Sequence, residues 1–210
     1  MVRRIVSHCT IVAVLLLLGG QVAKANSITY TFQGFGTGSL GTTSFTNSFF
    51  RIKLTADTSS IMQFTIPICK PSACTIFTVQ ATSAAISVAG LMAAITSPVG
   101  IFDNQTFMGL GLGRRSASGP GGGGPDFLDI GSSVFANYNL AHGLGPIGPF
   151  TGGVFQFKCS FGCVTTGLGN LSMSNASGVT FAASPEPASM LLFGSGALFV
   201  AGIRRRKSAR

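Results

Sequence analysis

Apolar and polar side chains alternate with a period of two through much of the chain, and this pattern constrains the fold more than any other feature. In residues 28–33 and 50–55 every second side chain is apolar, and residues 62–68 repeat the arrangement. Such alternation places apolar side chains on one face of a β-strand, whereas an amphipathic helix repeats its apolar face every three to four residues. Further strands are expected at residues 75–80, 85–89, 106–112, 134–140, 154–158, 171–174 and 179–183.

Short strands separated by clusters of Gly, Pro, Asn and Ser indicate an all-β domain, built as an antiparallel β-sandwich or a barrel-like fold. Two regions interrupt the pattern. Residues 81–94 form either a pair of strands or a short helix, and Ile86, Val88 and the flanking Gly90 favour strands. Residues 114–125 carry a run of glycines with little side chain to bury, which predicts an exposed loop.

The first 25 residues have the three parts of a secretory signal peptide. Arg3 and Arg4 precede an apolar core at residues 11–18, and Ala23 and Ala25 flank Lys24 as a small-x-small cleavage site. The segment is therefore expected to form a signal helix that enters the Sec translocon. Signal peptidase would cut it so that the mature chain begins near Asn26.

The last residues of the chain form three blocks in strict order. A proline-rich tripeptide comes first, an apolar run at residues 190–203 follows, and a cluster of cations comes last. The tripeptide and the basic cluster are Pro185, Glu186 and Pro187, and Arg204, Arg205, Arg206 and Lys207.

The apolar run is short for a permanent membrane anchor. As a helix its 14 residues would extend roughly 21 Å, against roughly 30 Å of hydrocarbon, and three glycines loosen it further. The cations after it stay on the cytoplasmic side, which leaves the preceding chain outside the inner membrane. This segment is therefore expected to be a C-terminal transmembrane helix that holds the chain in the inner membrane for a time.

The three blocks together resemble the PEP-CTERM sorting signal of exported bacterial proteins. The resemblance implies that an exosortase, an integral-membrane transpeptidase-like protease, processes the chain near the tripeptide. Residues 27–57 and 126–148 also look like segments of PEP-CTERM passengers, and they carry no catalytic residues to transfer. The family is associated with bacteria that produce exopolysaccharide, which implies a final place at the cell surface or in the extracellular matrix. The alternative is an ordinary C-terminal anchor.

The formal net charge of +9 comes mainly from the two ends of the chain. Residues 26–184 contain six Lys and Arg residues and four Asp residues, so this part is close to neutral. A near-neutral domain lacks the basic surface that binds nucleic acid, so no nucleic-acid partner is expected.

Residues 26–184 hold few groups that could perform catalysis. His142 is the single histidine there, it lies in a glycine-rich stretch, and glutamate is absent. Asp126 and Asp129 are three residues apart, which in an extended strand places them on opposite faces. The inventory predicts that the protein is not an enzyme and has no cofactor.

Residues 121–129 fit the calcium-binding nonapeptide pattern G-G-x-G-x-D-x-U-x. That pattern holds calcium between stacked turns of several copies, and this chain has one copy. A glycine-rich loop followed by a strand is the preferred interpretation, and no metal site is predicted.

Four cysteines remain after removal of the leader: Cys69, Cys74, Cys159 and Cys163. Export places them in an oxidising compartment, where an even number favours disulfides, although a zinc site remains the alternative. Three pairings exist. Local pairs, each closing a β-hairpin, are predicted because the first two cysteines flank a turn between expected strands, and the last two flank another.

These observations divide the chain into a signal peptide (1–25), a β-rich passenger (26–184) and a sorting signal (185–210). We predict an exported, non-catalytic protein of the envelope or extracellular matrix. Its expected role is structural or adhesive, in contact with extracellular polysaccharide in a biofilm. The alternative is a secreted glycan-binding module.

Overall fold

A computed structural model describes residues 27–67, 73–115, 123–152 and 164–186 of the chain. Within these ranges the protein is all-β, as the alternating pattern predicts, and its strands pair antiparallel. The strands are β1 (Ser27–Leu40), β2 (Thr43–Asp57), β3 (Met62–Ile66), β4 (Cys74–Val88), β5 (Leu91–Ala94), β6 (Val99–Asn104), β7 (Gly109–Arg115), β8 (Gly123–Gly131), β9 (Leu144–Gly152), β10 (Val164–Thr166) and β11 (Gly169–Pro185). Two short 3₁₀ helices are η1 (Thr58–Ser60) and η2 (Ser133–Asn137).

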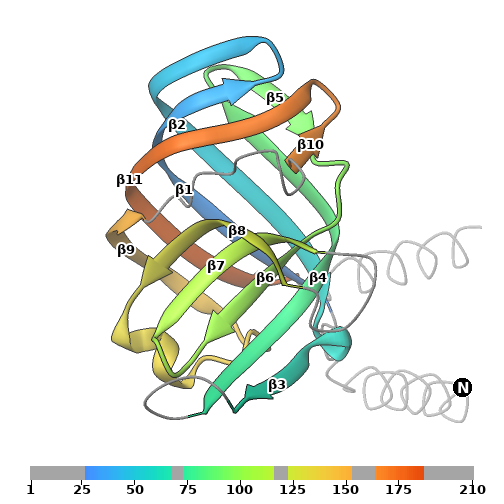
Figure 1. The fold of residues 1–210 in the computed structure, drawn as a ribbon, viewed down its shortest axis with the longest axis vertical. Helices are drawn as coiled ribbons and strands as arrows, with labels where there is room; N and C mark the ends of the chain where they lie inside the picture. The colour runs from blue at the N-terminus through green and yellow to red at the C-terminus, as the bar shows by residue number, and fades with distance from the viewer. Residues whose placement is uncertain (1–26, 68–72, 116–122, 153–163, 187–210) are drawn as a thin grey trace, which may run out of the picture. The chain divides into compact units, whose positions relative to one another are not determined.

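The strands form one sheet that is nearly closed into a barrel (Figure 1). Its main path runs β10-β11-β1-β2-β4-β6-β7-β8, and β9 pairs with β11 on the side away from β1. The two strands that end the ring, β8 and β9, follow each other in the chain and lie in contact. Of the two architectures predicted, the barrel is therefore the better description.

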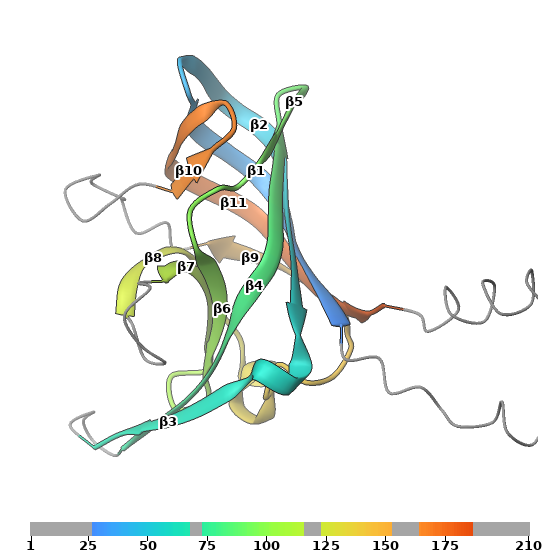
Figure 2. The ribbon, with the colours of Figure 1, turned by 90° about the vertical axis from the view of Figure 1, so that its right-hand side faces the viewer.

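Strand β4 joins the two parts of the sheet. Residues 76–80 pair with β6, and residues 74–78 pair on the other side with β3. Further along, residues 81–88 pair with β2 and residues 85–88 pair with β5. Figure 2 shows β4 running down the barrel, with β2 and β5 beside its upper part and β6 beside its lower part. β4 thus changes neighbours on both sides halfway along its length.

Aromatic side chains fill the barrel interior around Phe181. Its ring centroid lies 5.0 Å from that of Phe32, and the rings of Tyr30, Phe135 and Tyr138 approach it to between 6.1 and 6.3 Å. Four of these five side chains are fully buried, and Tyr138 is 7% exposed. Ring pairs at such distances stabilise a core by about 0.5–1.5 kcal/mol each beyond their burial.

One tyrosine hydroxyl ties the segment between β8 and β9 to the barrel, and a second closes a turn within that segment. Tyr30 donates a hydrogen bond to the carbonyl oxygen of Leu140 at 2.6 Å, and Tyr138 donates to that of His142 at 3.0 Å. Each buried hydroxyl therefore has a partner, as a buried polar group requires.

Residues 81–94 form a pair of strands, the end of β4 and β5, so the preferred prediction for this region is confirmed. The two residues between them, Ala89 and Gly90, have φ angles of 51° and 78°. Positive φ at both central positions is typical of a type I′ hairpin turn. Asn-Gly is the usual sequence of such a turn, and Ala-Gly is a weaker indication of it.

Several strand predictions were wrong in detail. The strand predicted at residues 134–140 is η2 and the coil after it, because the Ser132 side chain accepts a hydrogen bond from the Val134 amide and starts a 3₁₀ turn. The strand predicted at 106–112 begins later, at Gly109, after a turn. β6, β9 and β10 were not predicted. The segments predicted separately at 75–80 and 85–89 belong to one strand, β4, and those at 171–174 and 179–183 belong to β11.

The signal helix and the C-terminal transmembrane helix fall in residues 1–26 and 187–210, outside the described residues, and stay predictions. The strand predicted at 154–158 also lies outside them. Among the residues that the structure describes, none belongs to a helix with the length and apolar character of a membrane span.

Candidate functional site

The Pro-Glu-Pro tripeptide begins at the last residue of the last strand of the barrel. β11 ends at Pro185, which stands opposite Ile28 in the pairing of β11 with β1. The amide of Glu186 then donates a hydrogen bond to the carbonyl oxygen of Ser27 at 3.0 Å, and the Thr29 hydroxyl donates to Glu186 Oε1 at 3.4 Å. Two of the three predicted motif residues therefore lie against β1, and Pro187 is outside the described residues.

The buried part of β11 stops just before the tripeptide. Ala183 is 4% exposed and pairs with Leu144 of β9, whereas Ser184, Pro185 and Glu186 are exposed. Pro185 takes the next inward position, opposite the buried Ile28, but it is the last residue of the strand and is exposed there. The tripeptide therefore begins just after the last residue of β11 that is buried in the barrel core.

The first described residue of β1, Ser27, lies beside Glu186 near the end of β11. The predicted signal-peptidase site at Ala23 and Ala25 and the basic cluster from Arg204 to Lys207 lie outside the described residues, and the structure does not test their roles. The two ends of the passenger nevertheless meet at one rim of the barrel.

Asp103 is the most deeply buried charged residue of the described chain. Its side chain is 0% exposed, and neither carboxylate oxygen has a hydrogen-bond partner among the described residues. It stands on β6 opposite the buried Leu110, facing the barrel interior. Burial raises the pKa of the Asp103 carboxyl to about 8, so it is mostly protonated at neutral pH. No sequence pattern indicated this burial, because an isolated Asp usually lies at the protein surface.

The prediction that Asp126 and Asp129 lie on opposite faces was wrong. In the pairing of β7 with β8, Asp129 stands opposite Gly111 and Asp126 opposite Gly113, with a register shift between. The extra residue of a β-bulge reverses the alternation, so two side chains three apart come to the same face. Burial and then the nearby Asp126 charge raise the pKa of Asp129 to about 7.

Asp103 and Asp129 do not lie together. Asp103 faces inward and Asp129 lies on the other face of the sheet, since its partner Gly111 is paired with Phe102 and not with Asp103. His142 is exposed in the segment before β9. Among the described residues, no three His, Cys, Asp or Glu side chains lie close enough to hold one metal ion.

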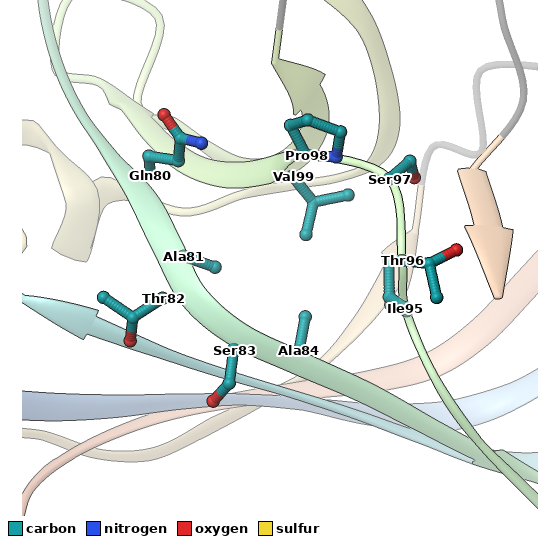
Figure 3. A pocket seen from close by; sticks show the side chains of 10 residues that line it. All are labelled: Gln80, Ala81, Thr82, Ser83, Ala84, Ile95, Thr96, Ser97, Pro98 and Val99. Carbon is teal, nitrogen blue, oxygen red and sulfur yellow. The ribbon is translucent and has the colours of Figure 1, made fainter. Parts of the chain in front are cut away.

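A shallow hollow of about 190 Å³ opens where β4 leaves β6 and joins β5 (Figure 3). Ala81, Thr82 and Ser83 line one side, and Thr96 and Ser97 line the other. The Thr82 hydroxyl donates to the carbonyl oxygen of Thr55, and the Ser97 hydroxyl accepts from the amide of Thr165. Its ten lining residues include no acid, base or cysteine, so its Ser and Thr hydroxyls have no base among them that could activate a nucleophile.

An exposed aromatic pair lies on the outer face of β1 and β2. Phe35 and Phe49 are 47% and 46% exposed, and their rings meet edge to face with centroids 5.8 Å apart. The guanidinium of Arg51 lies 5.8 Å above the Phe49 ring, and its Nε donates to Gln33 Oε1 at 3.2 Å. Sequence reasoning missed this pair because both phenylalanines looked like ordinary strand residues.

Of the predicted disulfide cysteines, Cys74 lies among the described residues. It is fully buried at the start of β4 and is disulfide-bonded. Cys69, Cys159 and Cys163 lie outside those residues, so the local pairing Cys69–Cys74 and Cys159–Cys163 stays a prediction. The hairpin that the first pair would close is present, since Ile66 of β3 stands opposite Cys74.

Comparison with curated proteins finds no match for this chain, and comparison with solved structures finds none either. A family model does match, over residues 185–207, and it describes the PEP-CTERM protein-sorting motif. Those residues include the tripeptide that leaves β11, the apolar run and the basic cluster. The chain carries the PEP-CTERM sorting motif of exosortase substrates.

Proposed function

We propose that this protein is an exported, non-catalytic component of the bacterial envelope or extracellular matrix, with a structural or adhesive role among exopolysaccharides. The observation that carries the proposal is the sorting motif that continues directly from the last strand of a nearly closed barrel. The barrel is then the exported domain, and the C-terminal tail is the signal that directs its sorting.

The surface of the barrel supports a structural role. The outward positions of β1 hold Thr29, Thr31 and Gln33, and small hydroxyl residues recur on the outer face of β4 and β11. Such a surface is hydrated without large charge, so it does not repel neighbouring copies or polysaccharide chains. The near-neutral composition of residues 26–184 has the same consequence.

The proposed route has three steps. The Sec translocon and signal peptidase deliver the chain across the inner membrane and remove residues 1–25. The apolar run then anchors the chain in that membrane while the barrel folds outside. Exosortase processes the chain near the tripeptide and releases the passenger toward the cell surface or matrix.

The first prediction tests the processing step. With one epitope tag inserted between β7 and β8, at residues 116–122, and another after Arg210, the mature protein is expected to keep the first tag and lose the second. Glu186→Ala is expected to reduce processing at least tenfold, because it removes the carboxylate of the tripeptide while the apolar run remains. Immunoblots of membrane and secreted fractions from an exosortase-positive host measure both effects.

Ser184→Ala is the matched control, since Ser184 is exposed, adjoins the tripeptide and lies outside it. It is expected to leave processing unchanged. Mature protein that retains the tag after Arg210 in that host would contradict the sorting function.

A glycan-binding module is the second candidate, and the exposed Phe35–Phe49 pair favours it. Aromatic rings at a protein surface provide apolar faces on which sugar rings stack, and Arg51 beside them suits an acidic sugar.

Pull-down of the purified passenger with the host's exopolysaccharide tests this candidate. Phe49→Ala is expected to weaken binding at least tenfold, because truncation of a central aromatic contact costs about 2 kcal/mol. Phe107→Ala, which removes a ring that is 58% exposed in a turn between β6 and β7, serves as the control. Equal binding by both variants and the parent would exclude the aromatic pair as the glycan site.

A further inference from the structure

We propose that strand β1 competes with exosortase for the sorting motif, so that processing occurs only after residues 184–186 leave β1. This inference rests on the proposed function, because it concerns how the same motif reaches its enzyme. The barrel would then withhold or release its own processing signal through the last pair of strands.

The competition arises from shared backbone groups. Proteases and transpeptidases commonly bind substrate as an extended strand, whose amides and carbonyls pair with the walls of the cleft. In the folded barrel the Glu186 amide is already bonded to Ser27, and Pro185 stands opposite Ile28. One edge of the motif is therefore occupied by β1.

The other edge of Pro185 is also approached closely. A side-chain carbon added at Gly143 would lie 3.0 Å from Pro185 Cδ and 3.4 Å from the carbonyl oxygen of Ala183. The chain before β9 thus runs alongside the end of β11. An enzyme cleft cannot enclose Pro185 from both sides while the strand stays in place.

The side chain that identifies the motif is held as well. The Thr29 hydroxyl donates to Glu186 Oε1 at 3.4 Å, which is a long and exposed hydrogen bond. An enzyme that recognises the Glu186 carboxylate must replace this contact. Because the bond is weak, replacing it does not require unfolding of the barrel.

The last residues of β11 can separate from β1 with a small loss of stabilising contacts. Ser184, Pro185 and Glu186 are exposed and so bury little surface of their own in the fold, whereas Ala183 and Phe181 are buried and anchor the strand. Pro185 has no amide hydrogen and contributes no donor to the pairing with β1. The boundary between the fixed and the detachable part therefore lies between Ala183 and Ser184.

A disulfide that locks this end tests the proposal in the full-length chain. Thr29 and Ser184 stand directly opposite each other on the outer face, as do Thr31 and Ala182 two residues further in. The double variant Thr29→Cys/Ser184→Cys is expected to slow processing at least tenfold in a pulse-chase experiment, and reductant is expected to restore the rate. Thr31→Cys/Ala182→Cys, which leaves residues 184–186 free to detach, is expected to be processed at the parental rate.

A second variant shifts the rate in the opposite direction and needs no new cysteine. Insertion of Gly-Ser-Gly between Ser184 and Pro185 carries the motif beyond β1, and processing is expected to become faster. An unprocessed parental chain in the exosortase-positive host would refute the proposed function itself. A processed parent, with the locked variant equally fast or the insertion slower, would refute the competition alone.

Discussion

Gly111→Ala is expected to lower the free energy of unfolding by about 3 kcal/mol, at the upper end of the usual cost of overpacking. A methyl carbon at Gly111 would collide with Asp129 Oδ1, would lie 2.6 Å from the Phe102 ring, and would lie 2.7 Å from the backbone carbonyl oxygen of Leu128. The last of these atoms belongs to the paired strand β8, so the clash cannot be relieved by a side-chain rotation alone. Urea denaturation followed by circular dichroism measures the loss.

Gly109→Ala on the same strand provides the control. No atom of the described chain lies within 4 Å of the carbon that this substitution adds. The exchange is therefore expected to leave stability unchanged or to raise it by a few tenths of a kcal/mol, through the lower entropy of the unfolded chain. Equal losses at the two positions would show that the cost comes from glycine flexibility and not from the contact with Asp129.

Asp103→Asn is expected to change how stability depends on pH. The pKa of the carboxyl is about 8 in the folded protein and about 4 in an unfolded chain. Between these values unfolding releases a proton, so the parent loses stability as pH rises from about 4 to about 8. The variant has no proton to release there, and its stability relative to the parent is expected to rise by on the order of 4 kcal/mol over that interval.

The slope with pH is the informative quantity, because a buried amide at position 103 adds its own pH-independent cost. Asp129 also has a raised pKa, but it is present in both proteins and cancels in their difference. Asp57→Asn provides the opposite sign, since hydrogen bonds from the Ser59 side chain and then its amide lower the pKa of Asp57. That carboxylate stabilises the fold above its usual pKa, and the contribution is lost as pH falls. A difference between Asp103→Asn and the parent that stays flat from pH 4 to 8 would show that Asp103 is ionised in the fold.

The alternation of side chains could predict faces but not register. For β1 and β2 it identified the inward residues correctly, because a regular strand repeats every two residues. At β8 the same rule wrongly put Asp126 and Asp129 on opposite faces, because one extra residue near Phe127 shifts the pairing with β7. A bulge depends on the partner strand, and no pattern within β8 alone reveals it.

The sorting motif could be predicted from the sequence, because it is defined by the order of its three blocks along the chain and not by how the chain folds. The pairing of the motif with β1 could not be predicted, because Ser27 and Glu186 are far apart in sequence and their contact depends on how the barrel closes. The burial of Asp103 could not be predicted for the same reason. Its environment is made by Leu110 and by Tyr138, which come from other elements.

The pairing of the first strand with the last also sets an order of events during export. Thr29 and Glu186 are 157 residues apart, and an exported chain crosses the membrane from its N-terminus. β2 can join β1 early, but the other edge of β1 stays open until nearly all of the passenger has emerged. Such long-range closure is slow, and an open strand edge invites pairing with other chains. A tail that keeps each chain tethered during this interval would limit encounters between incomplete barrels, so the membrane segment would act as a folding aid before it is cut away.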